Sequence, residues 1–159
     1  MSEALERRLA RLEAVEAITQ LKVDYAKACD EGYDPDRFVS FFTEDAVWDG
    51  GEAFGVHTGK QAIHARIAEF GQHMAFALHY MVAPKIEVAD DATTARGSWY
   101  LFEPCTIDGR AIWLTGTYEE SYRREMQADS TPAWKFTYVR LDLETVSPFE
   151  SGWLKERFV

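Results

Sequence analysis

Apolar residues near the start of the chain recur at steps of three and four, which is the spacing of one face of a helix. Asp30-Glu31-Gly32 ends this pattern, and Gly32 suits the left-handed position that follows a helix. We therefore predict a long amphipathic helix whose buried stripe is Leu5, Leu9, Leu12, Val15, Ile18, Leu21, Tyr25 and Cys29.

Two further helices are expected before residue 71. Asp34-Pro35 is typical of an N-cap followed by proline at the first helical position, and the short helix it starts buries Phe38, Phe41 and Phe42. Residues 46–49 resemble a short strand. Thr58 and Gln61 fit a capping box, and the third helix that follows has an inward face of Ile63, Ile67 and Phe70.

From about residue 76 the period of the apolar positions changes to two, the period of a strand. Four strands are predicted over residues 76–88, 94–107, 111–125 and 133–146, with Asp108-Gly109 as a hairpin turn. Helices followed by an antiparallel meander indicate an α+β fold, with the helices packed on one face of a sheet. With no internal repeat or linker in the sequence, we predict one domain over residues 1–159.

Charge and composition narrow the class of protein. The net charge is −10 and no lysine or arginine cluster occurs, so nucleic acids and anionic membrane surfaces are poor partners. Cys29 and Cys105 do not suggest a disulfide framework. The N-terminus lacks the apolar stretch of a signal peptide, and the nearly uncharged run 74–84 is too short to span a bilayer. We expect a cytoplasmic protein.

Several common catalytic motifs are missing from the sequence. It contains no G-x-S-x-G, no P-loop and no Rossmann glycine pattern, and none of its four histidines is spaced with another as a metal pair. We therefore expect no metal and no nucleotide cofactor.

Polar residues inside the apolar strands are the candidates for chemistry. His79 lies in Phe-Ala-Leu-His-Tyr-Met-Val and is either a functional group or a core histidine satisfied locally. Arg140 shares strand parity with Trp134, Phe136 and Tyr138, so we expect it on an inward aromatic face. A buried guanidinium needs a carboxylate, which Glu103 offers; an ion pair at the sheet margin is the alternative.

Two residues near the end of the first helix complete the candidates. Asp30 is placed where a carboxylate meets the unfavourable pole of the helix dipole, so it is either a solvated helix end or a partner for a histidine. Tyr25, one turn earlier on the buried stripe, has a hydroxyl that needs a partner or a substrate.

Four segments together resemble the SnoaL-like branch of the nuclear transport factor 2-like superfamily. They are Phe-Phe-Thr-Glu-Asp-Ala-Val-Trp (41–48), the histidine strand, Gly-Ser-Trp-Tyr-Leu (97–101) and Trp-Lys-Phe-Thr-Tyr-Val-Arg (134–140). The likeness is strongest to bile acid 7α-dehydratase and then to hexachlorocyclohexane dehydrochlorinase. It implies a cone-shaped α+β barrel, in which three helices close a strongly curved, mostly antiparallel sheet around an apolar pocket. The core would be residues 8–147, with the tail 148–159 as a lid or subunit contact.

The resemblance also implies a set of site residues. The family's dehydratases use a tyrosine, an aspartate, a histidine and an arginine, which match Tyr25, Asp30, His79 and Arg140 here. Glu103 stands where the dehydratase has an aspartate, which shifts the carboxylate and leaves the substrate open. We expect Glu103 to bind substrate together with Trp99, Tyr138 and Trp48.

The leading hypothesis is a cofactor-free lyase of the dehydratase type, or an isomerase, acting on a small apolar ring compound such as a steroid, terpenoid, polyketide or aromatic intermediate. His79 would be the general base, Asp30 its orienting partner, Tyr25 a donor to a substrate oxygen, and Arg140 a polarising group held by Glu103. The alternatives are a non-catalytic binding module, such as the small subunit of an aromatic-ring dioxygenase, and a polyketide cyclase or ketosteroid isomerase analogue. The relatives' assembly and the apolar tail predict a homo-oligomer, with a trimer favoured.

Overall fold

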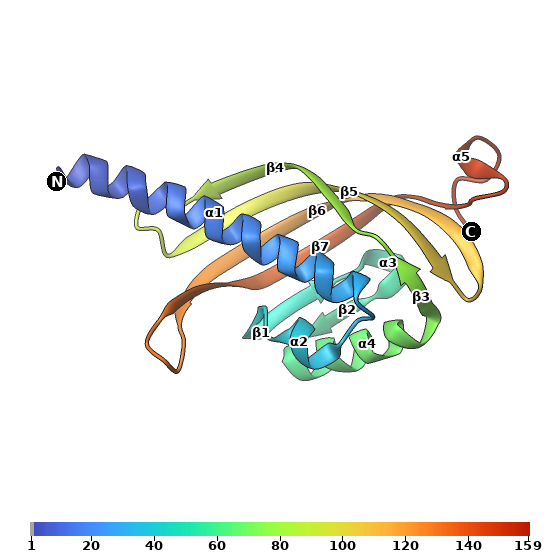
Figure 1. The fold of residues 1–159 in the computed structure, drawn as a ribbon, viewed down its shortest axis with the longest axis horizontal. Coiled ribbons are helices and arrows are strands. Elements are labelled where there is room, and N and C mark those ends of the chain that lie inside the picture. The colour runs from blue at the N-terminus through green and yellow to red at the C-terminus, as the bar shows by residue number, and fades with distance from the viewer. Residues whose placement is uncertain (1) are drawn as a thin grey trace.

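The computed structural model describes residues 2–159, and its long first helix lies across one face of a curved sheet (Figure 1). The fold is α+β, as predicted, with a strongly curled, mostly antiparallel sheet. The helices are α1 (Glu3–Asp30), α2 (Pro35–Val39), α3 (Gly51–Phe54), α4 (Lys60–His73) and α5 (Gly152–Lys155). The strands are β1 (Phe42–Asp49), β2 (Val56–Thr58), β3 (Met74–Ala77), β4 (Tyr80–Val88), β5 (Thr94–Ile107), β6 (Arg110–Met126) and β7 (Pro132–Pro148).

The sheet has the order β2-β1-β7-β6-β5-β3, and β4 also pairs with β5. β1 runs parallel to β7, and the other pairs are antiparallel. Along β5 buried and accessible residues alternate, so Trp99, Leu101, Glu103 and Cys105 share the inner face. α1, α2 and α4 close this inner side, and the core lies between them and the long strands.

The strand predicted over residues 76–88 is in fact two strands, β3 and β4, separated by Leu78 and His79. Ala77 pairs with Cys105 and Tyr80 with Phe102, so His79 lies directly opposite Glu103. The ladder is interrupted there because the His79 N–H donates to the Asp30 carboxylate, 2.9 Å away, instead of to β5. This break was not visible in the alternating pattern, and it positions the histidine.

A bulge in β7 overturns the predicted parity of Arg140. Tyr122 pairs with Phe136 and Ser121 with Tyr138, so Thr137 has no partner and the strand gains one residue. One extra residue sends every later side chain to the opposite face. Phe136 is therefore buried inside, whereas Tyr138 and Arg140 leave the inner face.

Three local predictions have mixed outcomes. Asp34 caps α2 by accepting from the N–H groups of Asp36 and Arg37, and Gly32 has the left-handed φ of 104° expected after α1. The capping box of Thr58 and Gln61 is wrong: α4 begins after Gly59 without a side-chain cap, because Thr58 belongs to β2.

The first three turns of α1 are not buried as the stripe predicted. Leu5, Leu9 and Leu12 are 48%, 44% and 67% exposed, and burial starts at Ala14. Figure 1 shows the reason, because the N-terminal end of α1 extends past the ends of the strands. Among residues 2–159, no helix combines the length and apolar character that crossing a membrane requires.

Candidate active site

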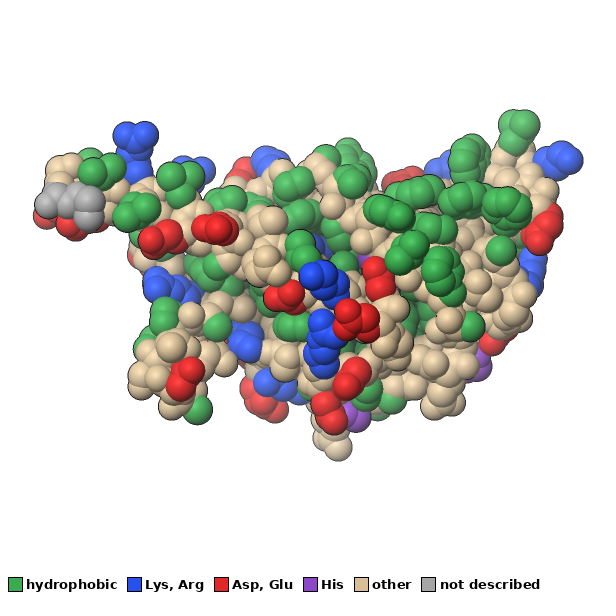
Figure 2. Space-filling view, in the orientation of Figure 1, with side chains coloured by type: hydrophobic (Ala, Val, Ile, Leu, Met, Phe, Trp, Pro, Cys, Tyr) green, Lys and Arg blue, Asp and Glu red, His purple; other side chains and the backbone are tan. Residues whose placement is uncertain are grey.

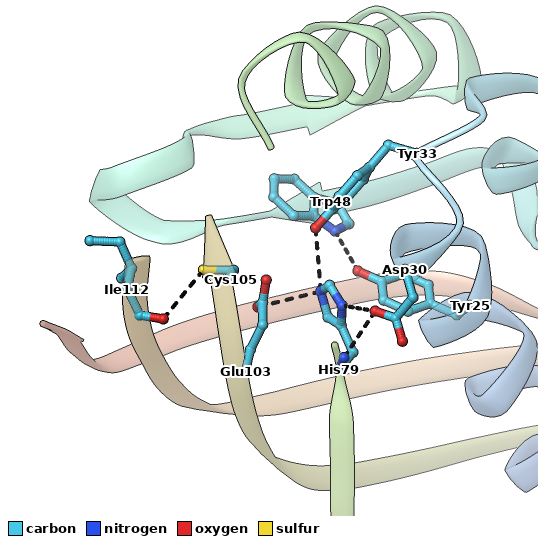
Figure 3. Close-up of polar contacts among 8 residues, drawn as sticks. All are labelled: Tyr25, Asp30, Tyr33, Trp48, His79, Glu103, Cys105 and Ile112. Carbon is cyan, nitrogen blue, oxygen red and sulfur yellow. Dashed lines mark hydrogen bonds and ion pairs between the residues drawn. The ribbon is translucent and has the colours of Figure 1, made fainter. Parts of the chain in front are cut away.

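A histidine, two carboxylates and two tyrosines meet on the inner side of the sheet (Figure 3). Asp30 is the last residue of α1, and His79 occupies the break between β3 and β4. Glu103 projects from the middle of β5, Tyr25 from α1, and Tyr33 follows α1 in the turn toward α2. The site thus depends on one helix end and two neighbouring strands.

Asp30 holds His79 by both its backbone and its ring. The same oxygen, Asp30 Oδ1, lies 2.9 Å from the His79 backbone nitrogen and 2.7 Å from ring atom Nδ1. A carboxylate accepts only, so Nδ1 carries the hydrogen and Nε2 is left as the acceptor. The histidine side chain is 4% exposed, which fixes its orientation further. The structure therefore gives Asp30 the histidine partner that one of the two sequence interpretations required.

The free nitrogen of the histidine faces two other groups. Nε2 lies 3.4 Å from the Tyr33 hydroxyl and 3.4 Å from Glu103 Oε2. Burial raises the pKa of the Glu103 carboxyl above its ordinary value; His79 opposes this shift, and the nearby Asp30 charge adds to it. The Nε2 side of His79 therefore faces two polar groups at long distance, and one of them, Glu103, holds a proton more readily than an ordinary carboxyl.

These groups border a narrow, largely apolar cavity of about 30 Å³. That volume accommodates little more than a water molecule, whereas pockets for ring-sized ligands measure roughly 300–1,000 Å³. A ring compound therefore requires side chains to move. The lining residues come from every layer of the fold: Tyr25, Cys29, Tyr33, Phe38, Trp48, Phe54, Ile67, Phe70, Met74, His79, Glu103, Leu114, Tyr118 and Leu141.

Tyr25 and Trp48 both reach this cavity, as the sequence predicted. Trp48 Nε1 donates to the Tyr25 hydroxyl oxygen at 3.2 Å. Burial raises the pKa of the Tyr25 phenol well above its usual value, so the hydroxyl keeps its proton. Tyr25 is thus a neutral group that both accepts a hydrogen bond and has one to donate.

Arg140 lies elsewhere, and its expected pairing with Glu103 is wrong. Its Nη1 binds Asp49 Oδ2 at 2.7 Å and its Nε binds Asp142 Oδ1 at 2.7 Å. Tyr138 donates to the same Asp49 oxygen at 3.2 Å. The cause is the β7 bulge, which turns Arg140 and Tyr138 off the inner face. The arginine forms the ion pair at the sheet margin that was the alternative interpretation.

Trp99 is buried on the inner face but does not line the cavity. Its indole Nε1 donates to the Tyr122 hydroxyl at 3.2 Å, further along the sheet. Tyr122 in turn donates to Glu120, which pairs with Lys22. Trp99 therefore belongs to a separate polar cluster beneath the site, and substrate contact by this residue is not supported.

Sequence reasoning missed Tyr33 and the buried pair of Lys22 and Glu120. Lys22 carried a signal, because it lies four residues after Ile18 and seven before Cys29, on the buried stripe. Its side chain is 1% exposed and its Nζ lies 3.4 Å from the centre of the Tyr118 ring. Tyr33 carried none, because the sequence does not show that the turn after α1 returns to His79.

A metal site requires several donor side chains that gather around one point. Within residues 2–159, no three histidine, cysteine or acidic side chains gather in a way that could hold a metal ion. The polar groups of the site instead contact one another in pairs, with a general base geometry at their centre.

Comparison with known families agrees with this architecture. The SnoaL-like domain family matches residues 10–140, most of the sequence, and the chain belongs to this family. A search of curated proteins gives no significant match. Membership fixes the fold class within the nuclear transport factor 2-like superfamily.

Solved structures with the same fold include several from Novosphingobium. A protein of Novosphingobium aromaticivorans provisionally called an aromatic ring hydroxylase is 27% identical, with a TM-score of 0.75, over 86% of this chain and 94% of that one. Hexachlorocyclohexane dehydrochlorinase LinA-type3 of Novosphingobium barchaimii is 21% identical, with a TM-score of 0.75, over 89% and 94%. A Novosphingobium aromaticivorans protein provisionally called a scytalone dehydratase is 20% identical, with a TM-score of 0.75, over 88% and 90%.

Proposed function

We propose that this protein is a cofactor-free lyase or isomerase that removes a C–H proton from a small, largely apolar ring compound. The observation that carries the proposal is the 2.7 Å contact between Asp30 and His79 Nδ1, while Nε2 of the same ring is directed at Tyr33 and Glu103, two residues that line the cavity. An imidazole with one nitrogen held by a carboxylate and the other in only long polar contacts is the usual arrangement of a general base.

Each polar group has a part in such a step. His79 Nε2 takes the proton, and Asp30 stabilises the imidazolium that forms. Tyr25, which keeps its own proton, donates to a substrate oxygen on which negative charge develops. The lining is otherwise mostly aromatic and aliphatic, which favours an apolar ring as the bound group.

The names of structural neighbours support this class of reaction. One is called a dehydrochlorinase and another, provisionally, a dehydratase. Both names describe the loss of a small molecule from adjacent carbons, for which proton removal by a base is sufficient. Their identities of 21% and 20% establish the fold alone, so the substrate of this chain is not inferred from them.

A non-catalytic ligand-binding subunit is the second candidate. A binding module gives no role to a histidine oriented at both its backbone and its ring by one carboxylate. A cyclase or isomerase with a lone carboxylate base requires Asp30 to point into the cavity away from His79, and it does not.

The test is deuterium exchange at the carbon beside the carbonyl of cyclohexanone in D₂O, followed by NMR. The native protein should catalyse the exchange, and His79→Gln should lose roughly 10²–10⁴ of the rate. Glutamine has a similar volume and can still bond Asp30, so unfolding free energy should fall by only about 1 kcal/mol. Asp30→Asn should lose a smaller but large part of the rate, because an amide does not stabilise the imidazolium.

The core-histidine interpretation predicts the opposite order. In that case His79→Gln has a clearly lower melting temperature and a normal exchange rate in the folded fraction. Chelator treatment of the native protein should leave exchange unchanged. Loss of exchange on chelation, with recovery on adding zinc, would contradict the cofactor-free proposal.

A further inference from the structure

Glu103 is the most unusual polar group of the inner face. Its residue is 3% exposed, and its Oε1 is buried without a hydrogen-bond partner in the described part of the chain. Its other oxygen, Oε2, lies 3.4 Å from His79 Nε2, too long for a strong charge-assisted hydrogen bond, which measures about 2.7–2.9 Å. A carboxylate at the centre of the fold is thus left almost unsupported.

An ionised carboxylate in that position is costly because a buried charge needs several hydrogen bonds or a close opposite charge. The titratable groups that face it are largely neutral or negative, and burial raises its pKa. Only His79 offers possible positive charge, and Asp30 already binds the opposite side of that ring. The neighbours in question are Asp30 and Cys29 from α1, Tyr33 after it, Cys105 on β5 itself and Tyr118 on β6.

We propose that Glu103 is the general acid of this site, a neutral carboxylic acid that protonates the hydroxyl leaving group of the substrate while His79 removes the proton from the adjacent carbon. This inference rests on the proposed function and narrows it to dehydration of a ring compound bearing a hydroxyl one carbon removed from the reacting C–H, such as a β-hydroxy ketone. Chloride leaves as an anion without help, whereas hydroxide is a poor leaving group and needs a proton. A buried acid beside the base therefore favours hydroxyl-bearing substrates.

The step is balanced without any further reactant. The C–H proton goes to His79 Nε2, and the electron pair of that bond forms the C=C bond. The C–O bond breaks, its pair remains on oxygen, and the Glu103 proton completes the water that leaves. The site is then imidazolium and carboxylate, and transfer of the proton from Nε2 to Oε2 across the 3.4 Å gap restores both groups.

The spacing also sets the stereochemistry. His79 and Glu103 are cross-strand neighbours on the same inner face, so acid and base approach the substrate from one side. Only a hydrogen and a hydroxyl on the same face of the ring can meet both groups at once. Elimination should therefore be syn, whereas an anti elimination requires acid and base on opposite sides of the ring.

Infrared difference spectroscopy tests the protonation of Glu103 without a substrate. Spectra of the native protein and of Glu103→Gln are compared at pH 7 in H₂O and D₂O, with Glu119→Gln, an exposed carboxyl on β6, as the control. The native protein should have a carboxylic acid C=O band that shifts in D₂O, that Glu103→Gln lacks and that the control retains. Loss of an ionised carboxylate band in Glu103→Gln instead would overturn the proposal.

A pair of leaving groups tests the catalytic role. The probes are β-hydroxycyclohexanone and β-chlorocyclohexanone, both converted to cyclohexenone, with deuterium placed cis or trans to the leaving group. Glu103→Gln, which donates a hydrogen bond but transfers no proton, should lose roughly 10²–10⁴ of the rate on the hydroxy ketone and under tenfold on the chloro ketone. Glu103→Leu should behave in the same way, and the native protein should release the cis deuterium from the hydroxy ketone.

The outcomes separate this inference from the function on which it rests. Equal losses on both ketones, or release of the trans deuterium, would overturn the acid role of Glu103 while leaving His79 as base. His79→Gln should lose both reactions equally. If it retained both, together with cyclohexanone exchange, the proposed function itself would be wrong.

Discussion

At the scale of single residues, the site is governed by which polar groups are satisfied and which are not. One oxygen of Asp30 accepts hydrogen bonds from both the backbone N–H and the ring Nδ1 of His79, so the histidine has a fixed tautomer. Glu103 has no such support, although its side chain is only 4% exposed, against 23% for that of Asp30. The contrast separates the two carboxyls: Asp30 orients the histidine, and burial favours the protonated form of Glu103.

The raised pKa of Glu103 predicts how stability depends on pH. The folded state holds the proton more tightly than the unfolded chain, whose carboxyl titrates near about pH 4.3. The contribution of this group is therefore fully present below that pH and is lost as pH rises through the higher folded pKa. As pH rises through this window, the unfolding free energy of Glu103→Gln relative to that of the native protein should increase by about 1.4 kcal/mol for each unit of the pKa shift.

Urea unfolding from pH 4 to pH 8 measures this difference. The control is Glu119→Gln, whose stability should follow that of the native protein through the same range. A Glu103→Gln curve parallel to the native one would mean that Glu103 titrates alike in both states.

At the scale of elements, a buried ion pair joins α1 to β6 below the site. Lys22 and Glu120 are 1% and 0% exposed in their side chains, and Tyr122 adds a hydrogen bond to Glu120. The Lys22 ammonium also lies over the rings of Tyr25 and Tyr118. The pair therefore fixes the helix that carries both Tyr25 and Asp30 against the sheet.

Removing one partner of this pair should lower the unfolding free energy strongly. Glu120→Gln leaves Lys22 buried without its counter-charge and should cost about 3–5 kcal/mol at pH 7. Burial lowers the pKa of Lys22 and Glu120 opposes this shift, so in Glu120→Gln the folded state should bind the Lys22 proton still more weakly, and the loss should shrink as pH rises toward about 10. The double variant Lys22→Met with Glu120→Gln should recover much of the stability in urea titrations. An equal loss in the single and double variants would assign the effect to packing alone.

The short helix α3 borders the cavity through its last residue. Its last residue, Phe54, lines the cavity and packs edge-on against Phe70, with ring centres 5.0 Å apart. Gly51 and Gly55 bound the helix with φ of 66° and 78°, which glycine adopts without strain. α3 is thus the part of the rim whose side chain can move with least cost to the core.

Phe54→Ala should enlarge the cavity and change its preference for substrate size. Exchange of a two-ring ketone such as decalone should rise relative to cyclohexanone by about tenfold, if about 1.4 kcal/mol of gating is removed. Unfolding free energy should fall by about 2 kcal/mol, less than for a fully buried phenylalanine. Phe149→Ala, an exposed ring on the outer side, should leave the ratio unchanged. An unaltered ratio in Phe54→Ala would place the entrance elsewhere.

At the scale of the whole molecule, a continuous row of aromatic rings lies on the outer face of the sheet. Tyr80 contacts Phe102, Phe102 stacks on Trp113 at 5.5 Å, and Trp113 meets Phe149 and Trp153. We call this row the outer aromatic ladder. Figure 2 shows apolar side chains gathered on the same end of the molecule. Tyr80, Phe149 and Trp153 are 51%, 61% and 59% exposed. Contiguous exposed apolar surface of this kind is typical of a protein interface.

We expect the outer aromatic ladder to form the contact of a homo-oligomer, with a trimer favoured. Sedimentation equilibrium at micromolar concentration should give about three times the 18.2 kDa chain mass. Phe102→Lys should reduce this mass to that of the monomer, whereas Val56→Lys, at a more exposed apolar position on β2, should not. A native protein with the monomer mass would remove the expectation.

The sequence by itself determined the class of fold and half of the site. Periods of three to four and then two specified helices before a meander, because burial of one face imposes that spacing. His79 and Tyr25 were singled out because a polar group in an apolar stripe needs a partner, and Asp30 because a carboxylate is unfavourable at a helix C-terminus. Trp48 was expected from the family resemblance alone.

Only the tertiary structure decided where the strands break and bulge, because those shifts depend on pairing partners far along the chain. The gap at His79 exists because Asp30 takes the N–H that β5 would have used. The bulge at Thr137 removes Arg140 from the inner face, where strict alternation had placed it. Glu103 was thereby left without its expected counter-charge, and that loss, which no local pattern encodes, leaves a buried carboxyl beside His79.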